Sequence, residues 1–261
     1  MAFTVHAVMP GVWHIVDCMG VCMTLLEGEN AAMLVDTGYG IEDVADFMRH
    51  MTDLPLTVFL THNHHDHAMG ARCFPETYML EADMADWCMF TNDEMRRRVL
   101  TQAIGKNLPV DEKTFLAGEI PLPKVMKPGV IDLGGLTAEI IEAPGHTPGS
   151  AVVYVPERKL LLSGDDWNPC TWLFFPQALG LREYRSNMRG IQQLPFEKVL
   201  CPHREALYDR WMFDDFFNAL TDGNLRAAEP VNIAPYEQID TCKATLPHDQ
   251  VLVFDWAKSG L

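Results

Sequence analysis

Residues 61–67, Thr-His-Asn-His-His-Asp-His, directly follow an apolar β run at residues 56–60. Four of the chain's ten histidines lie in these seven residues. Imidazole nitrogens and carboxylate oxygens are the ligands that suit zinc and neighbouring first-row metals. An exposed polar turn is the alternative interpretation of such a run, so further potential ligands elsewhere in the chain become informative.

Three later segments each end an apolar strand with a potential ligand. Residues 143–150, Ala-Pro-Gly-His-Thr-Pro-Gly-Ser, contain His146 in a tight loop whose direction Pro and Gly restrict. Residues 161–166, Leu-Leu-Ser-Gly-Asp-Asp, end on acids that include Asp165, and Leu-Cys-Pro-His at 200–203 ends on a histidine. Rigid scaffolds assemble sites from distant sequence in this way. We therefore expect these residues to meet the histidine run.

Hydrophobic patterning predicts two β-rich blocks, each followed by helix. The first block has strands at 3–8, 12–17, 21–27, 31–36 and 56–60 and a helix at 41–51. The second has strands at 130–133, 136–142, 151–155, 159–163, 198–201 and 250–255 and helices at 180–194 and 206–220. Between them, 81–104 is predicted to be one long helix and 105–130 an irregular loop. We expect a single α/β domain over residues 1–261, with two sheets face to face, outer helices, and 81–130 as an insertion over the site.

Composition narrows the class of protein. The chain has 36 acidic and 20 basic residues among 261, a formal net charge of −16. This balance excludes an electrostatic nucleic-acid binder, whose affinity comes from Lys and Arg on phosphates, and it does not suit an anionic membrane surface. We expect a small-molecule substrate, preferably neutral or apolar, and neither nucleic acid nor membrane as a partner.

Three further features favour a cytoplasmic protein. Seven cysteines, an odd number without framework spacing, are typical of free thiols in a reducing compartment. No Lys or Arg precedes Arg49, and Pro10-Gly11 interrupts the first apolar residues, so no signal peptide is predicted. No apolar run approaches the roughly 18 residues of a membrane span.

Taken in order, the His-x-His-x-Asp-His run, the Pro-Gly-His-Thr-Pro-Gly loop, the Ser-Gly-Asp and the late histidine resemble the metallo-β-lactamase superfamily. Residues 34–38, Leu-Val-Asp-Thr-Gly, match the early Asp motif of that superfamily, and the resemblance spans roughly residues 10–210. It implies a four-layer αβ/βα sandwich of two mixed sheets with outer helices, and a metal site at one edge of the sheets.

The resemblance also assigns metal ligands. It implies that one divalent ion is held by His62, His64 and His146, that a second is held by Asp66, His67 and His203, and that Asp165 bridges them. His65 would be a non-ligand and Asp36 a supporting residue. Zinc is the expected metal, with iron or manganese as alternatives. At 201–204, Cys-Pro-His-Arg departs from the commoner Gly-His-Gly-like surroundings of the last ligand.

Histidines at both 64 and 67 favour the dinuclear hydrolytic branch, because the flavodiiron redox branch usually has Glu at the first position. A water between two cations about 3.5–4 Å apart would lose a proton near neutral pH and attack a carbonyl or phosphoryl centre. Asp66 or Asp165 would be the catalytic residue that takes up the proton. Cys201 is not needed as a nucleophile, and we interpret it as structural.

The motifs look most like the glyoxalase II and lactonase branch, which implies hydrolysis of a small ester, thioester or lactone. The chain lacks a clear basic C-terminal glutathione-binding helix, and Tyr184 is a candidate for the lactonase tyrosine by position alone. Two alternatives are a persulfide dioxygenase-like enzyme with one iron and a phosphodiesterase or nuclease of the same fold. The net charge of −16 weighs against the nuclease.

The residues around the site allow more than one interpretation. Several aromatic residues follow Asp165 in the sequence, among them Trp167, Trp172 and Phe174. They form either a pocket wall or part of the core. The segment 81–104 is either a lid over the substrate or a core helix. Its basic run, Arg96-Arg97-Arg98, is either a guide for an anionic substrate or, preferably, a solvated helix face. The oligomeric state stays open.

Overall fold

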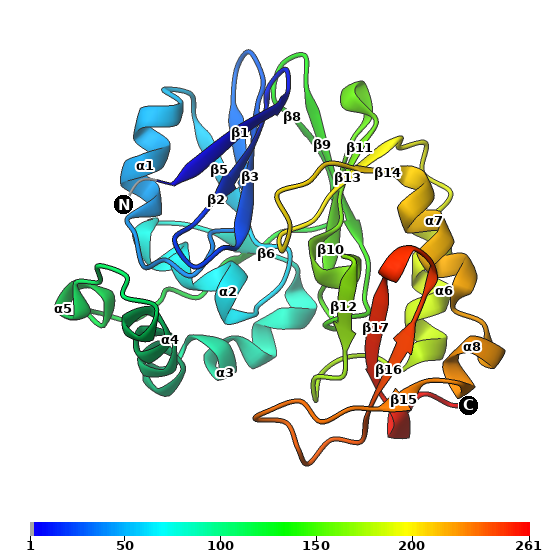
Figure 1. The fold of residues 1–261 in the computed structure, drawn as a ribbon. Coiled ribbons are helices and arrows are strands. Elements are labelled where there is room, and N and C mark those ends of the chain that lie inside the picture. The colour runs from blue at the N-terminus through cyan, green and yellow to red at the C-terminus, as the bar shows by residue number, and fades with distance from the viewer. Residues whose placement is uncertain (1–2) are drawn as a thin grey trace.

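The computed structural model describes residues 3–261, and their strands form three sheets (Figure 1). The first sheet has the order β1 (Thr4–Met9), β2 (Val12–Val16), β3 (Cys22–Glu27), β4 (Ala32–Val35), β5 (Leu56–Phe59), β6 (Tyr78–Met79) and β7 (Lys124–Val125). Its first four strands are antiparallel, and the pairs from β4 to β7 are parallel. The sheet is therefore mixed, as predicted.

The second half of the chain forms the other two sheets. The second sheet has the order β14 (Tyr208–Asp209), β13 (Lys198–Leu200), β11 (Leu160–Leu162), β10 (Ala151–Val155), β9 (Thr137–Glu142) and β8 (Gly129–Asp132). The third has the order β12 (Cys170–Leu173), β17 (Val251–Asp255), β16 (Thr241–Thr245) and β15 (Glu229–Pro230). The pattern of the sequence indicated only β17 of this third sheet.

Helices cover the outer faces and one end of the sheets. The α-helices are α1 (Val44–Met51), α2 (His65–Ala68), α3 (Trp87–Thr91), α4 (Asp93–Gly105), α5 (Glu112–Phe115), α6 (Leu181–Ile191), α7 (Arg210–Ala219) and α8 (Asp222–Arg226). Short 3-10 turns are η1 (Met69–Cys73), η2 (Glu81–Asp86), η3 (Pro156–Arg158), η4 (Gly164–Asp166), η5 (Pro247–Asp249) and η6 (Trp256–Lys258). Among residues 3–261, every helix is too short or too polar to span a bilayer.

Alternate residues of the central strands face different layers, as the two-residue period of a strand requires. In β4, Ala32 and Leu34 pack with α1, whereas Met33 and Val35 pack between the two large sheets. Alternate residues of β10 divide in the same way between the first sheet and helices α6 and α7. Each fully buried aliphatic side chain contributes about 1.5–3 kcal/mol, so this two-sided burial holds the sheets face to face.

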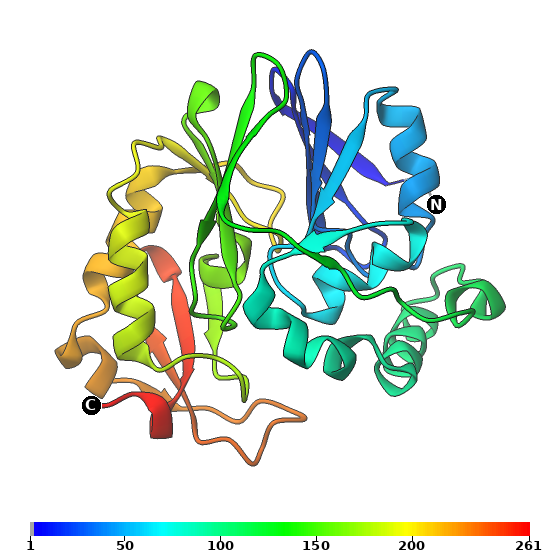
Figure 2. The ribbon, with the colours of Figure 1, turned by 180° about the vertical axis from the view of Figure 1, so that it is seen from behind.

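The layers therefore run α1, first sheet, second sheet, then α6 and α7. Figure 2 shows α1 outside one sheet and α6 and α7 outside the other, with α3, α4 and α5 gathered below the first sheet. This confirms the predicted αβ/βα sandwich of mixed sheets with outer helices. The added third sheet lies beside the second and carries the C-terminal part of the chain.

The prediction of one continuous helix over 81–104 is wrong, because the segment contains η2, α3 and α4 in succession. The break falls at Asn92, whose backbone is extended and whose side chain accepts a hydrogen bond from the amide of Met95. Asn is a favoured N-cap because its side-chain oxygen satisfies a free amide of the first turn. The chain therefore changes direction here and brings α4 back over the site.

Candidate metal centre

The strands that precede the predicted ligands all point the same way. β11 and β13 are parallel, and β9 and β11 are both antiparallel to β10, so β9, β11 and β13 end at one edge of the second sheet. The loop after β5 meets this edge from the first sheet, and the amide of Ala151 donates to the carbonyl of Thr61 across the junction. The topology therefore delivers ligands from both halves of the chain to one place.

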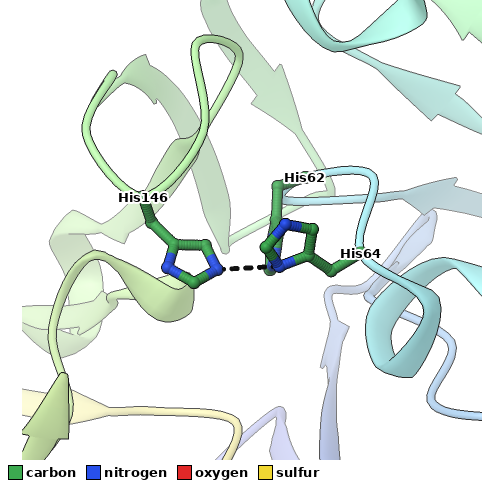
Figure 3. Close-up of side chains that lie close together, drawn as sticks. All are labelled: His62, His64 and His146. Carbon is green, nitrogen blue, oxygen red and sulfur yellow. Dashed lines mark hydrogen bonds between the residues drawn. The ribbon is translucent and has the colours of Figure 1, made fainter. Parts of the chain in front are cut away.

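The first cluster consists of His62, His64 and His146 (Figure 3). All three rings are buried, and the Nε2 of His146 lies 2.9 Å from the Nδ1 of His64. The backbone carbonyl of Trp172 lies 2.7 Å from the Nδ1 of His146, so a proton on that nitrogen leaves Nε2 as the lone-pair donor. These three residues could hold one ion.

The second cluster consists of Asp66, His67 and His203. The Oδ2 of Asp66 lies 3.8 Å from the Nε2 of His67 and 3.7 Å from the Nε2 of His203. The side chains of Asp66 and His203 are 16% and 28% exposed, so this cluster is open to the solvent side of the molecule. The last ligand predicted from sequence, His203, thus reaches the site despite its unusual neighbours.

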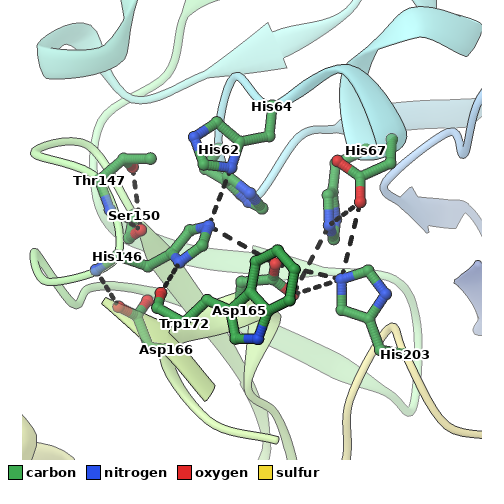
Figure 4. A network of polar contacts seen from close by, with 12 residues as sticks. His62, His64, His67, His146, Thr147, Ser150, Asp165, Asp166, Trp172 and His203 are labelled. Carbon is green, nitrogen blue, oxygen red and sulfur yellow. Dashed lines mark hydrogen bonds and ion pairs between the residues drawn. The ribbon is translucent and has the colours of Figure 1, made fainter. Parts of the chain in front are cut away.

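Asp165 lies between the two clusters, as Figure 4 shows. Its carboxylate oxygens are 3.5 Å from the Nε2 of His146, 3.6 Å from that of His67 and 3.1 Å from that of His203. His62, His67 and Asp165 also form a third set of ligand atoms within 4.8 Å of one another. The position suits a carboxylate that serves both ions.

The two clusters differ in electrostatics. Burial lowers the pKa of His62, His64 and His146, so these rings are neutral. Burial also opposes protonation of His67 and His203, but Asp165 and Asp66 beside them raise the pKa of both rings above the usual value.

The pKa of Asp66, the carboxylate of the second cluster, is shifted by the same pairing. Burial would raise the pKa of Asp66, yet the facing imidazoles of His67, His65 and His203 lower it to about 2. The second cluster is thus a charged network in which protons occupy positions that a cation could take.

Hydrogen bonds behind the rings fix their orientation. Asp36 lies 3.0 Å from the Nδ1 of His67 through its Oδ2 and accepts from the hydroxyl of Thr61. The same hydroxyl oxygen is 3.0 Å from the Nδ1 of His62. Because the outer nitrogen of each ring faces an acceptor, the inner nitrogen keeps its lone pair for a ligand. Asp36 therefore supports two rings, as the resemblance implied.

The donor set fits divalent metal ions. Within residues 3–261, the Nε2 atoms of His62 and His67 and the Oδ1 of Asp165 are buried without a hydrogen-bond partner. Buried polar atoms are normally satisfied, and these three point into the space between the clusters. Imidazole nitrogens with carboxylates are the ligand chemistry of zinc, iron and manganese sites. The structure brings all seven predicted ligands together, while the ligand roles themselves stay a prediction.

Asp83, which sequence reasoning missed, connects the two ligand loops. This residue of η2 is buried and accepts hydrogen bonds from the amides of Asn63 and Gly149 and from the hydroxyl of Thr147. Asn63 lies between two ligands of the first cluster, and Thr147 follows the third. A single aspartate at 83 in a helical stretch gives no local signal of such a role.

Gln177 was also missed. Its side-chain nitrogen is placed 2.6 Å from the Nε2 of His64, and its Oε1 is buried without a partner among the described residues. Side-chain amides are oriented by their hydrogen-bond network, and exchanging the two amide atoms would let Oε1 accept from the Nε2–H of the ring. That arrangement leaves the Nδ1 of His64 free to face the cluster.

A cavity of about 540 Å³ opens over both clusters. Its apolar wall comprises Phe90, Met95, Val99, Trp172, Phe175 and Pro235. Trp172 therefore lines the pocket, whereas Trp167 and Phe174 are fully buried in the core. The segment 81–104 does both: α3 and α4 supply part of the wall, and Trp87 packs inward.

Two interpretations from sequence are wrong. Tyr184 does not face the site, because its ring is fully buried and its hydroxyl donates to the backbone oxygen of Asp166. The basic run is not a uniform solvated face, since Arg96 is buried and donates to the backbone carbonyls of Phe115, Ala117 and Gly118. Arg98 instead lines the pocket. Arg96 and Arg98 lie less than one helical turn apart. Their side chains nevertheless point in different directions, because successive residues of a helix are rotated by about 100°.

Cys201 lies two residues before His203 but is 1% exposed. Burial raises the pKa of its thiol well above the usual value, which disfavours the thiolate that a nucleophile requires. The structural interpretation of this cysteine is consistent with its position in the core.

Comparison with known proteins places these features in a family. The family model of the metallo-beta-lactamase superfamily matches residues 16–203. The chain is 26% identical to acyl-coenzyme A thioesterase MBLAC2 of Gallus gallus over 200 residues, 69% of this chain and 70% of that protein.

Solved structures show the same fold. A metallo-beta-lactamase family protein from Thermus thermophilus has a TM-score of 0.60 at 18% identity, covering 85% of this chain and 82% of the other. A metallo-beta-lactamase from Pontibacter korlensis has a TM-score of 0.59 at 18% identity, covering 83% and 97%. The family match over most of the chain, the sandwich and the clustered histidines and aspartates agree: the chain belongs to the metallo-β-lactamase superfamily and is a metal-dependent hydrolase of that superfamily.

Proposed function

We propose that this protein is a dinuclear hydrolase of a small ester, thioester or lactone, and that a thioester is its preferred substrate. One observation carries the proposal: two ligand clusters share Asp165 at the floor of a cavity of about 540 Å³ with an apolar wall. Such a pocket accommodates the hydrocarbon part of an acyl compound and presents its carbonyl group to the clusters.

Two divalent cations, with Zn²⁺ as the expected metal, would supply Lewis acidity and a nucleophilic water near neutral pH. The chain's own residues then orient the reactants and move the proton. The carboxylates of Asp66 and Asp165 line the cavity, so either can accept the proton of an attacking water and pass it to the leaving group. Asp36 and the Trp172 carbonyl keep the imidazoles in one tautomer throughout.

The preference for a thioester is supported by the relative that is an acyl-coenzyme A thioesterase, 26% identical to this chain. We propose a small-molecule substrate, because a cavity of about 540 Å³ has the size of a small-ligand site.

The test combines metal content with a substrate panel. We expect about two metal equivalents per chain and hydrolysis of thioesters above esters, lactones, phosphodiesters and β-lactams. Assays run with and without oxygen provide the control for redox chemistry. One equivalent of iron with oxygen consumption would contradict the hydrolase and favour the dioxygenase alternative. Activity on phosphodiesters alone would favour the nuclease alternative.

A further inference from the structure

The cavity over the two clusters is richer in aromatic side chains than the chain as a whole. Five of its twenty lining residues are Phe, Trp or Tyr, whereas these types make up 10% of the sequence. They are Tyr39, Phe90, Trp172, Phe175 and Tyr236. Within residues 3–261, no Leu or Ile lines this cavity. Its apolar surface therefore consists to a large part of flat rings rather than branched aliphatic side chains.

Phe175 connects this aromatic surface to the first cluster. Its ring centroid lies 4.8 Å from that of His64 and 5.4 Å from that of His146. The same ring lies 5.4 Å from the ring of Tyr236 and 6.1 Å from that of Trp172. A continuous series of rings thus leads from the ligands of the first cluster to Trp172 and Tyr236.

Trp172 and Tyr236 both keep surface with which to contact a ligand. Trp172 of β12 is 38% exposed, although its ring packs 5.2 Å from that of Phe174. Tyr236 is half-buried and lies in the loop between β15 and β16, beyond residue 203, where the family match ends. Large apolar side chains exposed in a cavity are typical of ligand contacts. The third sheet and its loop therefore add an aromatic surface to the pocket.

Such a surface distinguishes an aromatic ligand from an alkyl ligand of similar size. Aromatic rings that pack edge to face or offset against one another gain stability beyond the area they bury. A rigid aryl group also has fewer rotatable bonds than an alkyl chain, so less conformational freedom is lost when it binds. Both effects favour an aryl group beside Phe175.

We propose that this enzyme is selective for substrates whose acyl half carries an aromatic ring, which packs against Phe175, Trp172 and Tyr236 while the carbonyl group faces the clusters. In the reaction, water adds to the carbonyl carbon, the bond from that carbon to sulfur or oxygen breaks, and the thiol or alcohol leaves with the proton of the water. This inference rests on the proposed hydrolase function and adds the chemical class of the acyl group.

The experiment compares two thioesters of one thiol in the metal-loaded enzyme, S-phenylacetyl and S-cyclohexylacetyl 2-mercaptoethanol. Their acyl groups have the same number of carbons, and a methylene separates each ring from the carbonyl group, so their intrinsic reactivity is similar. We expect wild type to prefer the phenylacetyl thioester by about fivefold in kcat/KM, the size of one aromatic contact. Tyr236→Leu should reduce this preference, and Trp172→Leu with Tyr236→Leu should erase it.

Two further variants are controls. Tyr236→Phe keeps the ring and should keep the preference of wild type. Trp211→Leu should keep it too, because Trp211 of α7 is 49% exposed and packs against His248 outside the cavity. Titration calorimetry with phenylacetate and cyclohexylacetate, the two products, measures the same selectivity without turnover. Wild type should bind phenylacetate several-fold more tightly, and the double variant should not.

Equal or reversed efficiency on the two thioesters in wild type would overturn this inference and leave the hydrolase standing. A double variant that loses kcat on both substrates at an unchanged ratio would also overturn it, because the two rings would then have only a structural role. If wild type hydrolyses no ester or thioester yet binds phenylacetate more tightly than cyclohexylacetate, the proposed function fails and the aromatic selectivity of the pocket stands.

Discussion

The two ligand clusters lie side by side but differ in burial and in charge. The first contains three buried, neutral imidazoles, with His62, His64 and His146 at 0%, 4% and 1% exposure. The second joins a carboxylate to two imidazoles, and its His203 side chain is 28% exposed. The first cluster would therefore bind an ion through buried neutral ligands, and the second through charge closer to the solvent.

This difference implies different roles for the ions that the two clusters would hold. His62, His64 and His146, as neutral ligands, would leave an ion in the first cluster with most of its charge, and such an ion would supply Lewis acidity toward a carbonyl group. The carboxylates of Asp66 and Asp165 compensate an ion in the second cluster and can also exchange protons with solvent. We expect the second cluster to release its ion more readily.

Asp66→Ala is expected to abolish hydrolysis and to leave about one metal equivalent bound, because it removes the carboxylate of the second cluster alone. Metal analysis and circular dichroism of the purified variant would measure both consequences. His65→Ala is the control, since its ring is the adjacent predicted non-ligand, and this variant should retain two equivalents. An Asp66→Ala enzyme with normal turnover would end the dinuclear proposal.

Acidification is expected to empty the second cluster first. The pKa of His67 and His203 is raised by Asp165 and Asp66 against the effect of burial, so protons compete with metal there as pH falls through those raised values. The pKa of His62, His64 and His146 is lowered, so these rings remain neutral at the same pH. Metal content measured from pH 8 to pH 5 should fall by about one equivalent while the first cluster keeps its ion, and activity should fall with it. Simultaneous release would contradict the contrast.

Asp83→Asn is expected to lower the free energy of unfolding by about 1–3 kcal/mol, because the new amide cannot accept from all three buried donors. It should also weaken metal binding in the first cluster, since Asp83 connects the loops of His62 and His146. Denaturant unfolding and metal titration measure these effects. Asp86→Asn, in the same 3-10 turn, is the control and should change neither. Loss of the second ion alone would contradict this assignment.

Gln177→Ala is expected to have the smallest effect, about a tenfold loss of metal affinity in the first cluster, as for other residues that orient a ligand ring. Gln177→Glu should restore part of the affinity, because a carboxylate also accepts from the Nε2–H of His64. Competition with a chromogenic chelator measures both. If Gln177→Ala binds both ions normally, the orientation of His64 depends on its packing between Phe90 and Phe175 instead.

Much of the fold and the ligand set could be predicted because their signals are local. Four potential ligands follow one strand within six residues, 62–67, and Pro and Gly hold His146 in a turn of eight. Apolar runs likewise marked the central strands, since β3, β4 and β10 bury nearly all of their residues. In these segments the chemistry depends on neighbours in the chain, and a short stretch of sequence contains the relevant information.

Tertiary structure alone decided which side chains support and surround those ligands. Asp83, Gln177 and Arg98 reach the site from separate segments, and nothing near them in sequence distinguishes them from their neighbours. The buried Arg96 and the pocket-lining Arg98 differ only in the helical face that packing turns inward. The net charge of −16 is a sum over the chain and contains no information on where charges gather, such as Arg98 and Arg204 at the pocket. Sequence order determines short-range chemistry, whereas the packing of distant segments determines the local field that a substrate meets.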